Sequence, residues 1–88
     1  MKVQFKTSFK KDLRNIENKD LLNRIKDTIE QTEKALTLQD ITNIRKLKGT
    51  RTYYRIRVGE YRVGLTVDGD EAIFVRCLDR KEIYRYFP

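Results

Sequence analysis

Arginine side chains alternate with apolar ones along residues 54–63, which read Tyr-Arg-Ile-Arg-Val-Gly-Glu-Tyr-Arg-Val. A period of two is typical of a strand with one buried face and one solvent face. The central Gly-Glu pair suits a two-residue hairpin turn, and this register sets Arg57 directly opposite Arg62. Like charges that face each other across a strand pair repel. The pattern is more simply explained if Arg55, Arg57 and Arg62 meet an anion, for which phosphate is the obvious candidate.

The residue inventory restricts the chemistry that such a site could perform. The 88 residues include no histidine and a single cysteine, Cys77. Cys/His and Ser/His catalytic pairs are therefore excluded, and the common zinc sites are not expected. No glycine-rich phosphate loop or dinucleotide fingerprint occurs, so we expect neither a metal nor a cofactor. Acid-base chemistry would have to come from Lys, Arg, Tyr, Asp or Glu.

Net charge indicates the class of partner. Twenty Lys and Arg residues against 13 Asp and Glu give a net charge of +7 and a pI near 9.7. This balance favours nucleic acid or an acidic protein as partner, with non-specific stickiness as the alternative. Neither a signal sequence nor an apolar run of ~18 residues is visible, so we expect one cytoplasmic domain over residues 1–88 without membrane contact.

Periodicity divides the first half of the chain into elements that would support the arginine face. Alternation at residues 2–6 predicts a short strand. A helix capped by Thr7 or Ser8 should follow and end near Asn18, and a second amphipathic helix should span roughly residues 20–35. The apolar stripes of both helices are interpreted as core.

The second half of the chain predicts a meander of three strands and a helical tail. After a loop from Thr37 to about Lys46, strands are expected at residues 52–58, 61–67 and 72–78. Residues 80–87 should form one or two helical turns. The expected fold is α+β, with a short N-terminal strand, two helices packed on one face of an antiparallel sheet, and a short C-terminal helical tail. The other face of the sheet keeps the arginines.

The orientation of the third strand depends on the turn before it, because a shift of one residue moves every side chain to the opposite face. A three-residue turn at 68–70 would bury the odd-numbered residues of 73–77 and place Arg76 beside Arg62. A turn with an even number of residues would bury Phe74 instead. The sequence leaves both registers open.

Four stretches, taken together and in order, resemble the RelE/ParE superfamily of bacterial toxins. They are residues 5–13, the Lys-Leu-Lys-Gly string at 46–49, the arginine strands at 54–63, and Asp-Arg-Lys-Glu-Ile-Tyr-Arg at 79–85. The resemblance implies a toxin of a type II toxin-antitoxin system that a cognate antitoxin neutralises. In the RelE branch such a toxin is a ribosome-dependent messenger RNA endoribonuclease, and in the ParE branch it poisons DNA gyrase. Both branches share one fold, so the fold alone does not separate them.

The resemblance also implies roles for individual residues. The basic pair of the family's strand corresponds to Arg55 and Arg57, and the arginine after Gly-x-Tyr corresponds to Arg62. The arginine and the tyrosine of the family's C-terminal segment correspond to Arg80 and Tyr84. In RelE-like ribonucleases these positions carry phosphate contacts and catalysis.

We favour the RelE branch and expect cleavage without metal, in which the ribose 2′-OH next to the scissile phosphate attacks while arginines neutralise the growing charge. The expected catalytic residues are Arg62, Arg80 and Tyr84. The expected nucleic-acid contacts are basic side chains on and around the sheet, namely Lys46, Lys48, Arg55, Arg57 and Arg76. The expected partners are the ribosome with its messenger RNA, and an acidic antitoxin.

The proton acceptor stays open among Tyr84, Asp79 and Glu82, because the pKa of arginine exceeds ~12. Many relatives carry histidine where this chain has Asp79. A gyrase-directed toxin and a non-catalytic basic binding module are the alternative functions. In the plainest interpretation the strand arginines are a solvated face, Arg80 pairs with Asp79 or Glu82, and Tyr84 packs on the sheet edge.

Overall fold

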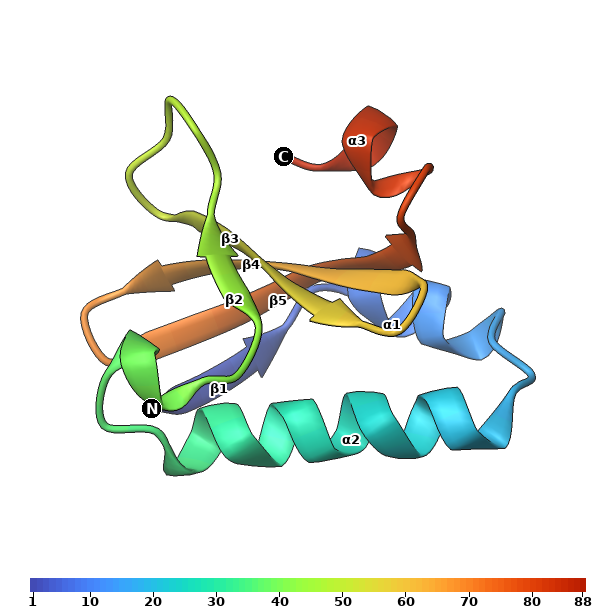
Figure 1. Ribbon diagram of the computed structural model, residues 1–88, viewed down its shortest axis with the longest axis horizontal. Coiled ribbons are helices and arrows are strands. Elements are labelled where there is room, and N and C mark those ends of the chain that lie inside the picture. The colour runs from blue at the N-terminus through green and yellow to red at the C-terminus, as the bar shows by residue number, and fades with distance from the viewer.

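A single five-stranded sheet organises the computed structural model, which describes residues 1–88 (Figure 1). Its strands are β1 (Lys2–Phe5), β2 (Ile44–Lys46), β3 (Tyr53–Val58), β4 (Tyr61–Asp68) and β5 (Glu71–Asp79). The strands lie in the order β1-β5-β4-β3-β2. Because β1 runs parallel to β5 while the other neighbours are antiparallel, the sheet is mixed, whereas the sequence predicted an antiparallel one.

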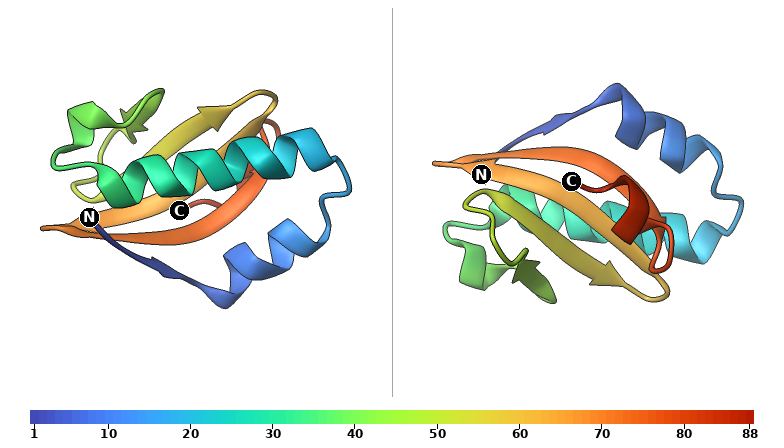
Figure 2. Two further views of the ribbon diagram at one scale, coloured as in Figure 1. Left: turned by 90° about the horizontal axis from the view of Figure 1, so that it is seen from below. Right: turned by 90° about the horizontal axis from the view of Figure 1, so that it is seen from above.

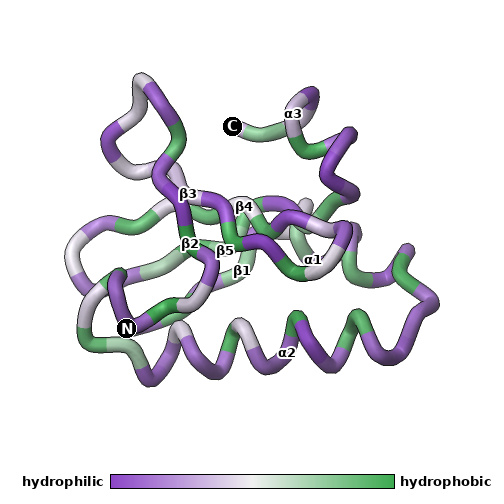
Figure 3. The backbone as a smooth tube through the Cα atoms, viewed as in Figure 1, coloured by the Kyte–Doolittle hydropathy of each residue, from purple (hydrophilic) through white to green (hydrophobic).

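Helices α1 (Thr7–Arg14) and α2 (Lys19–Lys34) cover one face of the sheet, and α3 (Ile83–Tyr86) lies over the opposite face (Figures 1 and 2). Apolar and polar residues alternate along α2, as its amphipathic pattern predicts (Figure 3). The apolar sides pack against the inner side chains of β3, β4 and β5. Phe9, Ile25, Val63 and Leu65 are at most 1% exposed. The α+β fold with two helices on one face is thus confirmed.

The boundaries of the two long helices differ in part from those expected. The first helix does not extend to Asn18; α1 ends at Arg14, and Asn18 is the N-cap of α2, where its side chain accepts a hydrogen bond of 3.1 Å from the Leu21 N–H. Neither Thr7 nor Ser8 caps α1, since both lie inside the helix. An Asn that precedes an apolar stripe is as good a start signal as a stop signal, and here it starts the second helix.

The region expected to be a loop between Thr37 and Lys46 contains a 3₁₀ turn, Leu38–Asp40, and the strand β2. Strand β2 pairs with β3 and sets Arg45 opposite Arg55. Three residues are too few to establish a period of two by themselves, and the pairing with β3 identifies them as a strand. It extends the arginine face by one strand.

The turn between β4 and β5 has two residues, with Asp68 opposite Glu71. This even-numbered turn places Phe74 on the core face, where it is fully buried. The register with Phe74 inside is therefore the correct one of the two for the first half of β5.

A β-bulge then reverses the alternation in the second half of β5. Gly64 lies opposite Arg76 while its neighbour Leu65 lies opposite Phe74, so β5 has one extra residue at this point. Cys77 thereby returns to the core face and is 1% exposed. The expectation that Arg76 lies beside Arg62 is wrong, because the bulge sets Arg76 opposite Gly64.

Beyond the end of β1, side chains of α1 satisfy the free edge of β5. The Ser8 hydroxyl donates a hydrogen bond of 2.6 Å to the Val75 carbonyl. The Asp12 carboxylate accepts one of 2.9 Å from the Cys77 N–H and two, of 2.8 and 3.0 Å, from the Arg76 guanidinium. Side chains of α1 thus hydrogen-bond to the part of the β5 edge that β1 does not reach, and they cover an edge that would otherwise be open to pairing.

None of the helices combines the length and the hydropathy that a membrane span requires.

Candidate functional site

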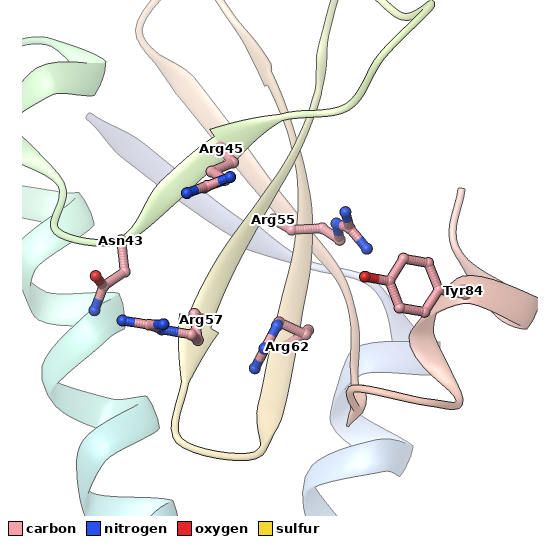
Figure 4. A pocket seen from close by; sticks show the side chains of 6 residues that line it. All are labelled: Asn43, Arg45, Arg55, Arg57, Arg62 and Tyr84. Carbon is pink, nitrogen blue, oxygen red and sulfur yellow. The ribbon is translucent and has the colours of Figure 1, made fainter.

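A hollow of about 270 Å³ opens on the sheet face opposite α1 and α2. Four arginines, one tyrosine and one asparagine line it: Asn43, Arg45, Arg55, Arg57, Arg62 and Tyr84 (Figure 4). No carboxylate lies among these residues. Four guanidinium groups without a counter-charge have the chemistry that suits an anion with several oxygens, such as a phosphate chain.

The pairing of β2, β3 and β4 brings these arginines together. Arg57 lies directly opposite Arg62, and Arg45 opposite Arg55. The first of these pairs is the one that the two-residue turn predicts from sequence, and its register is confirmed. Two like-charged pairs on adjacent ladders cost stability in the free protein, and that cost is relieved when an anion binds.

Backbone carbonyls of the hairpin turn hold the guanidinium of Arg62. Its Nη1 donates to the carbonyls of Gly59 and Tyr61, both at 2.9 Å. An arginine has five N–H donors, so this anchoring leaves the other donors for a ligand. The guanidinium of Arg62 is therefore oriented without any ligand, which would reduce the entropy lost on binding one.

Tyr84 enters the hollow from α3, on the side across from Asn43 (Figure 4). Its hydroxyl points into the hollow, and the Arg55 guanidinium carbon lies 4.6 Å from the centre of its ring (Figure 4). This is a cation–π contact. Although it is aromatic, Tyr84 is 70% exposed, so its ring is accessible to a ligand.

An adjoining hollow of about 530 Å³ is lined by Arg62, Arg80, Lys81 and Tyr84. It shares Arg62 and Tyr84 with the first hollow. The structure thus brings together the three residues that the sequence singled out for catalysis. The Arg80 guanidinium Nε lies 3.2 Å from a carboxylate oxygen of Glu60 in the hairpin turn, in an exposed ion pair that a phosphate can replace.

Only one of the three candidate proton acceptors lines either hollow, and it is Tyr84. The Asp79 carboxylate accepts a hydrogen bond of 2.9 Å from the Lys81 N–H and so stabilises the turn that follows β5. Glu82 lies in the same turn and is exposed. The suggested pairing of Arg80 with Asp79 or Glu82 does not occur, since Glu60 is its partner.

Three of the expected nucleic-acid contacts lie outside both hollows. Lys46 follows Arg45 in β2, so it points to the other side of the strand, and Lys48 lies in the loop after it. Arg76 is bound by Asp12, and this hydrogen bonding raises the pKa of the Arg76 guanidinium. Arg76 also lies over the ring of Tyr86, with the guanidinium carbon 5.5 Å from the ring centre. The guanidinium of Arg76 thus already has two partners within the protein, Asp12 and the ring of Tyr86.

Two lining residues, Asn43 and Arg45, were missed by sequence reasoning. The signal that could have found them is the polar-apolar-polar order of Asn43, Ile44 and Arg45, which continues the alternation of the arginine strands. Asn43 has a positive φ of 64°, and its carbonyl accepts a hydrogen bond of 3.2 Å from the Arg57 N–H. This bond fixes the start of β2 beside the end of β3.

No three His, Cys, Asp or Glu side chains gather in a way that would hold a metal ion.

Comparison with known families identifies one match that spans almost all of the chain. Residues 3–84 match the family described as the ParE toxin of the type II toxin-antitoxin system, parDE. The chain is 48% identical, over 89 residues and the whole of both sequences, to the protein "Toxin RelE3" of Methanocaldococcus jannaschii.

Solved structures show the same fold. The chain is similar to the RelB-RelE antitoxin-toxin complex from Methanococcus jannaschii, with 45% identity, a TM-score of 0.80, and coverage of 97% of this chain and 99% of the other. The archaeal RelE-RelB complex from Pyrococcus horikoshii OT3 matches with a TM-score of 0.73 over 90% and 93% of the two chains, and at 23% identity this match concerns the fold alone.

Proposed function

The chain belongs to the RelE/ParE superfamily as a RelE-like toxin of a type II toxin-antitoxin system, and from this premise we propose that it is a metal-independent endoribonuclease that cuts messenger RNA on the ribosome. One observation carries the proposal: Arg62, Arg80 and Tyr84 line one hollow, and Arg55 and Arg57 line the hollow that adjoins it. An inhibitor that only docks on another protein would not need a tyrosine hydroxyl aimed among arginines.

The proposed reaction uses the RNA's own nucleophile. The ribose 2′-OH gives up its proton as its oxygen attacks the neighbouring phosphorus, and the bond from that phosphorus to the 5′ oxygen of the next nucleotide breaks. The products are a 2′,3′-cyclic phosphate and a 5′-hydroxyl, whose oxygen takes up a proton as it leaves. Arg57 and Arg62 bind the phosphoryl oxygens, whose charge grows in the transition state, and Arg80 stabilises the leaving oxygen. Because the turn carbonyls already hold Arg62, little reorganisation is needed when the charge develops.

Tyr84 has two possible roles, which experiment separates. Its hydroxyl lies where it can exchange a proton with the reacting oxygens, and its exposed ring can stack on a base splayed out of the RNA. Arg55 covers part of the ring and holds it in place in both cases.

We further propose that an acidic antitoxin covers the arginine face. The two similar structures named above are complexes of RelE proteins with RelB antitoxins. This chain carries a net charge of +7 and an unpaired group of arginines on one face. Carboxylates of a partner would neutralise that group, and the association rate should fall as salt rises.

The test compares Tyr84→Phe and Tyr84→Ala in a single-turnover assay of messenger RNA cleavage on the ribosome. Proton transfer by the hydroxyl predicts a loss on the order of 10² to 10⁴ in rate for both variants with ribosome binding unchanged. Stacking predicts little loss for Phe and a large one for Ala. Tyr86→Phe is the matched control, since Tyr86 lies on the same helix outside both hollows. A wild-type protein that cuts no RNA but blocks supercoiling by gyrase would refute the proposal.

A further inference from the structure

Gly64, in the middle of β4, lies under the ring of Phe87. A Cβ atom added to Gly64 would lie 2.7 Å from two atoms of that ring, closer than any real contact. Gly64 lies at the β-bulge, but its backbone does not adopt a positive φ, so its conformation does not demand glycine. What the missing side chain provides is a slot in the surface of the sheet, on the face opposite the two long helices.

The ring of Phe87 fills this slot. Phe87 is 4% exposed, and its ring meets that of Tyr53 edge-on, with the centres 5.6 Å apart and the planes at 85°. Edge-to-face packing of this kind is a favourable arrangement of two aromatic rings. The backbone N–H of Phe87 donates a hydrogen bond of 2.9 Å to the Ile83 carbonyl, which links the residue in the slot to the start of α3.

Phe87 and Ile83 are buried, yet neither belongs to the core cluster beneath α1 and α2. They form a separate anchor for the C-terminal segment on the arginine face. Helix α3 has four residues, and so short a helix is not stable without tertiary contacts. These two are the buried side chains that anchor it on the sheet, beside the exposed contacts of Tyr84 with Arg55 and of Tyr86 with Arg76.

Tyr84 directly follows Ile83 and lies three residues before Phe87. Of the four residues of α3, it is the one that lines the hollows. We propose that Phe87, seated over Gly64, is the positioning residue that holds Tyr84 against Arg55 and among the arginines. The catalytic part of this inference rests on the proposed function, and the positioning part does not.

A slot that serves the Phe87 ring alone predicts a pattern of effects that ordinary destabilisation does not. If Gly64 exists to admit the ring of Phe87, then Gly64→Ala should matter only while the ring is there. In the wild-type background, Gly64→Ala displaces the ring and with it Tyr84, and a displacement of about 1 Å at a reacting group costs on the order of 10² in rate. In a Phe87→Ala background the slot is empty, and the same change should cost nothing further.

The experiment measures ribosome-bound messenger RNA cleavage for wild type, Gly64→Ala, Phe87→Ala and the double variant. We expect a loss on the order of 10² in rate for each single variant, no larger loss for the double, and unchanged ribosome affinity. Tyr86→Ala is the control, because it removes an aromatic ring from the same helix without emptying the slot. Losses that multiply in the double variant, or wild-type cleavage by Gly64→Ala, would overturn the inference.

A second readout does not depend on catalysis. In protein labelled with fluorotyrosine, five ¹⁹F resonances are expected, and Tyr84→Phe identifies that of Tyr84. Gly64→Ala and Phe87→Ala should shift the resonances of Tyr84 and Tyr53 and leave that of Tyr61 in place. If the wild type cuts no RNA, these shifts still decide the positioning claim. An unmoved Tyr84 resonance in both variants would refute it, and circular dichroism checks that each variant folds.

Discussion

Two arginines at the end of the same strand form ion pairs of opposite character. Arg76, within β5, makes two hydrogen bonds to an Asp12 carboxylate that is 7% exposed, whereas Arg80, just after β5, meets a Glu60 carboxylate that is 74% exposed. Burial of the acceptor makes the first pair part of the architecture, since a buried carboxylate cannot be left unpaired. The second pair is screened by water and leaves Arg80 able to exchange Glu60 for a phosphate. Judged by residue type alone, Arg76 and Arg80 would have the same role. Their carboxylate partners, one buried and one exposed, show that the roles differ.

Arg80→Ala is expected to have the largest effect on activity. If Arg80 stabilises the leaving oxygen, its removal should lower single-turnover cleavage by about 10² to 10³. The free energy of unfolding should change by no more than about 0.5 kcal/mol, because the ion pair is exposed. Urea denaturation and the ribosome-bound cleavage assay measure the two quantities. Full activity in this variant would show that Arg80 is as uninvolved in the chemistry as Arg76.

Asp12→Ala should have the reverse profile, in which stability falls first. The change strands the Arg76 guanidinium and the Cys77 N–H without their acceptor. We expect a loss of about 2 to 3 kcal/mol in the free energy of unfolding, measured with urea. Asp12→Asn retains an acceptor for the N–H and should lose less. A loss below about 0.5 kcal/mol for Asp12→Ala would mean that the buried pair contributes no more than the exposed one.

Cys77 reports on the buried pair from within the core. Burial, and next the Asp12 carboxylate, raise the pKa of its thiol from 9.0 to about 12. The folded thiol therefore stays protonated where the unfolded one ionises, so stability should fall as the pH rises above about 9. At pH 8 iodoacetamide should label Cys77 only in urea, whereas Asp12→Ala should admit slow labelling without it. Rapid labelling of the native wild type would contradict the burial of this edge.

The smallest effect is expected for Glu60→Gln. Removing the exposed carboxylate should change the free energy of unfolding by less than about 0.5 kcal/mol at any salt concentration. Cleavage should be unchanged or slightly faster, because Arg80 no longer exchanges one anion for another. The measurement is urea unfolding at low and high salt, beside the cleavage rate. A marked loss of activity would show that Glu60 orients Arg80 and does not merely occupy it.

Local features of the sequence predict some of the contacts of these arginines, whereas contacts with distant segments were not predictable. The register of β3 and β4 follows from a local turn and a period of two, so the opposition of Arg57 and Arg62 was predictable. The partner of Arg76 lies 64 residues away in α1, and nothing near Arg76 indicates it. The bulge in β5 and the strand β2 likewise depend on pairing with distant or very short segments, so Arg76 was assigned to the wrong place and Arg45 was missed.

The C-terminal segment, residues 80–87, also has features that the sequence predicts and features that it does not. The sequence predicted one or two helical turns over residues 80–87, whereas α3 begins only at Ile83, so Arg80 and Tyr84 line the same hollow without sharing a helix. The slot over Gly64 that receives Phe87 is a match of shape between two segments that are far apart in the sequence. A glycine inside a strand pattern signals a close approach of some kind, but the sequence does not say what approaches.

The parallel pairing of β1 with β5 bears on how the toxin folds. Residues 2–5 pair with residues 71–74, so this pairing joins two segments that lie far apart in the sequence. Contacts between such distant segments make folding slow, because the intervening chain must be ordered before they form. The sheet is therefore complete only when the segments between β1 and β5 are ordered. The anion hollow takes its side chains from β2, β3, β4 and α3, so a partly folded chain presents only part of it.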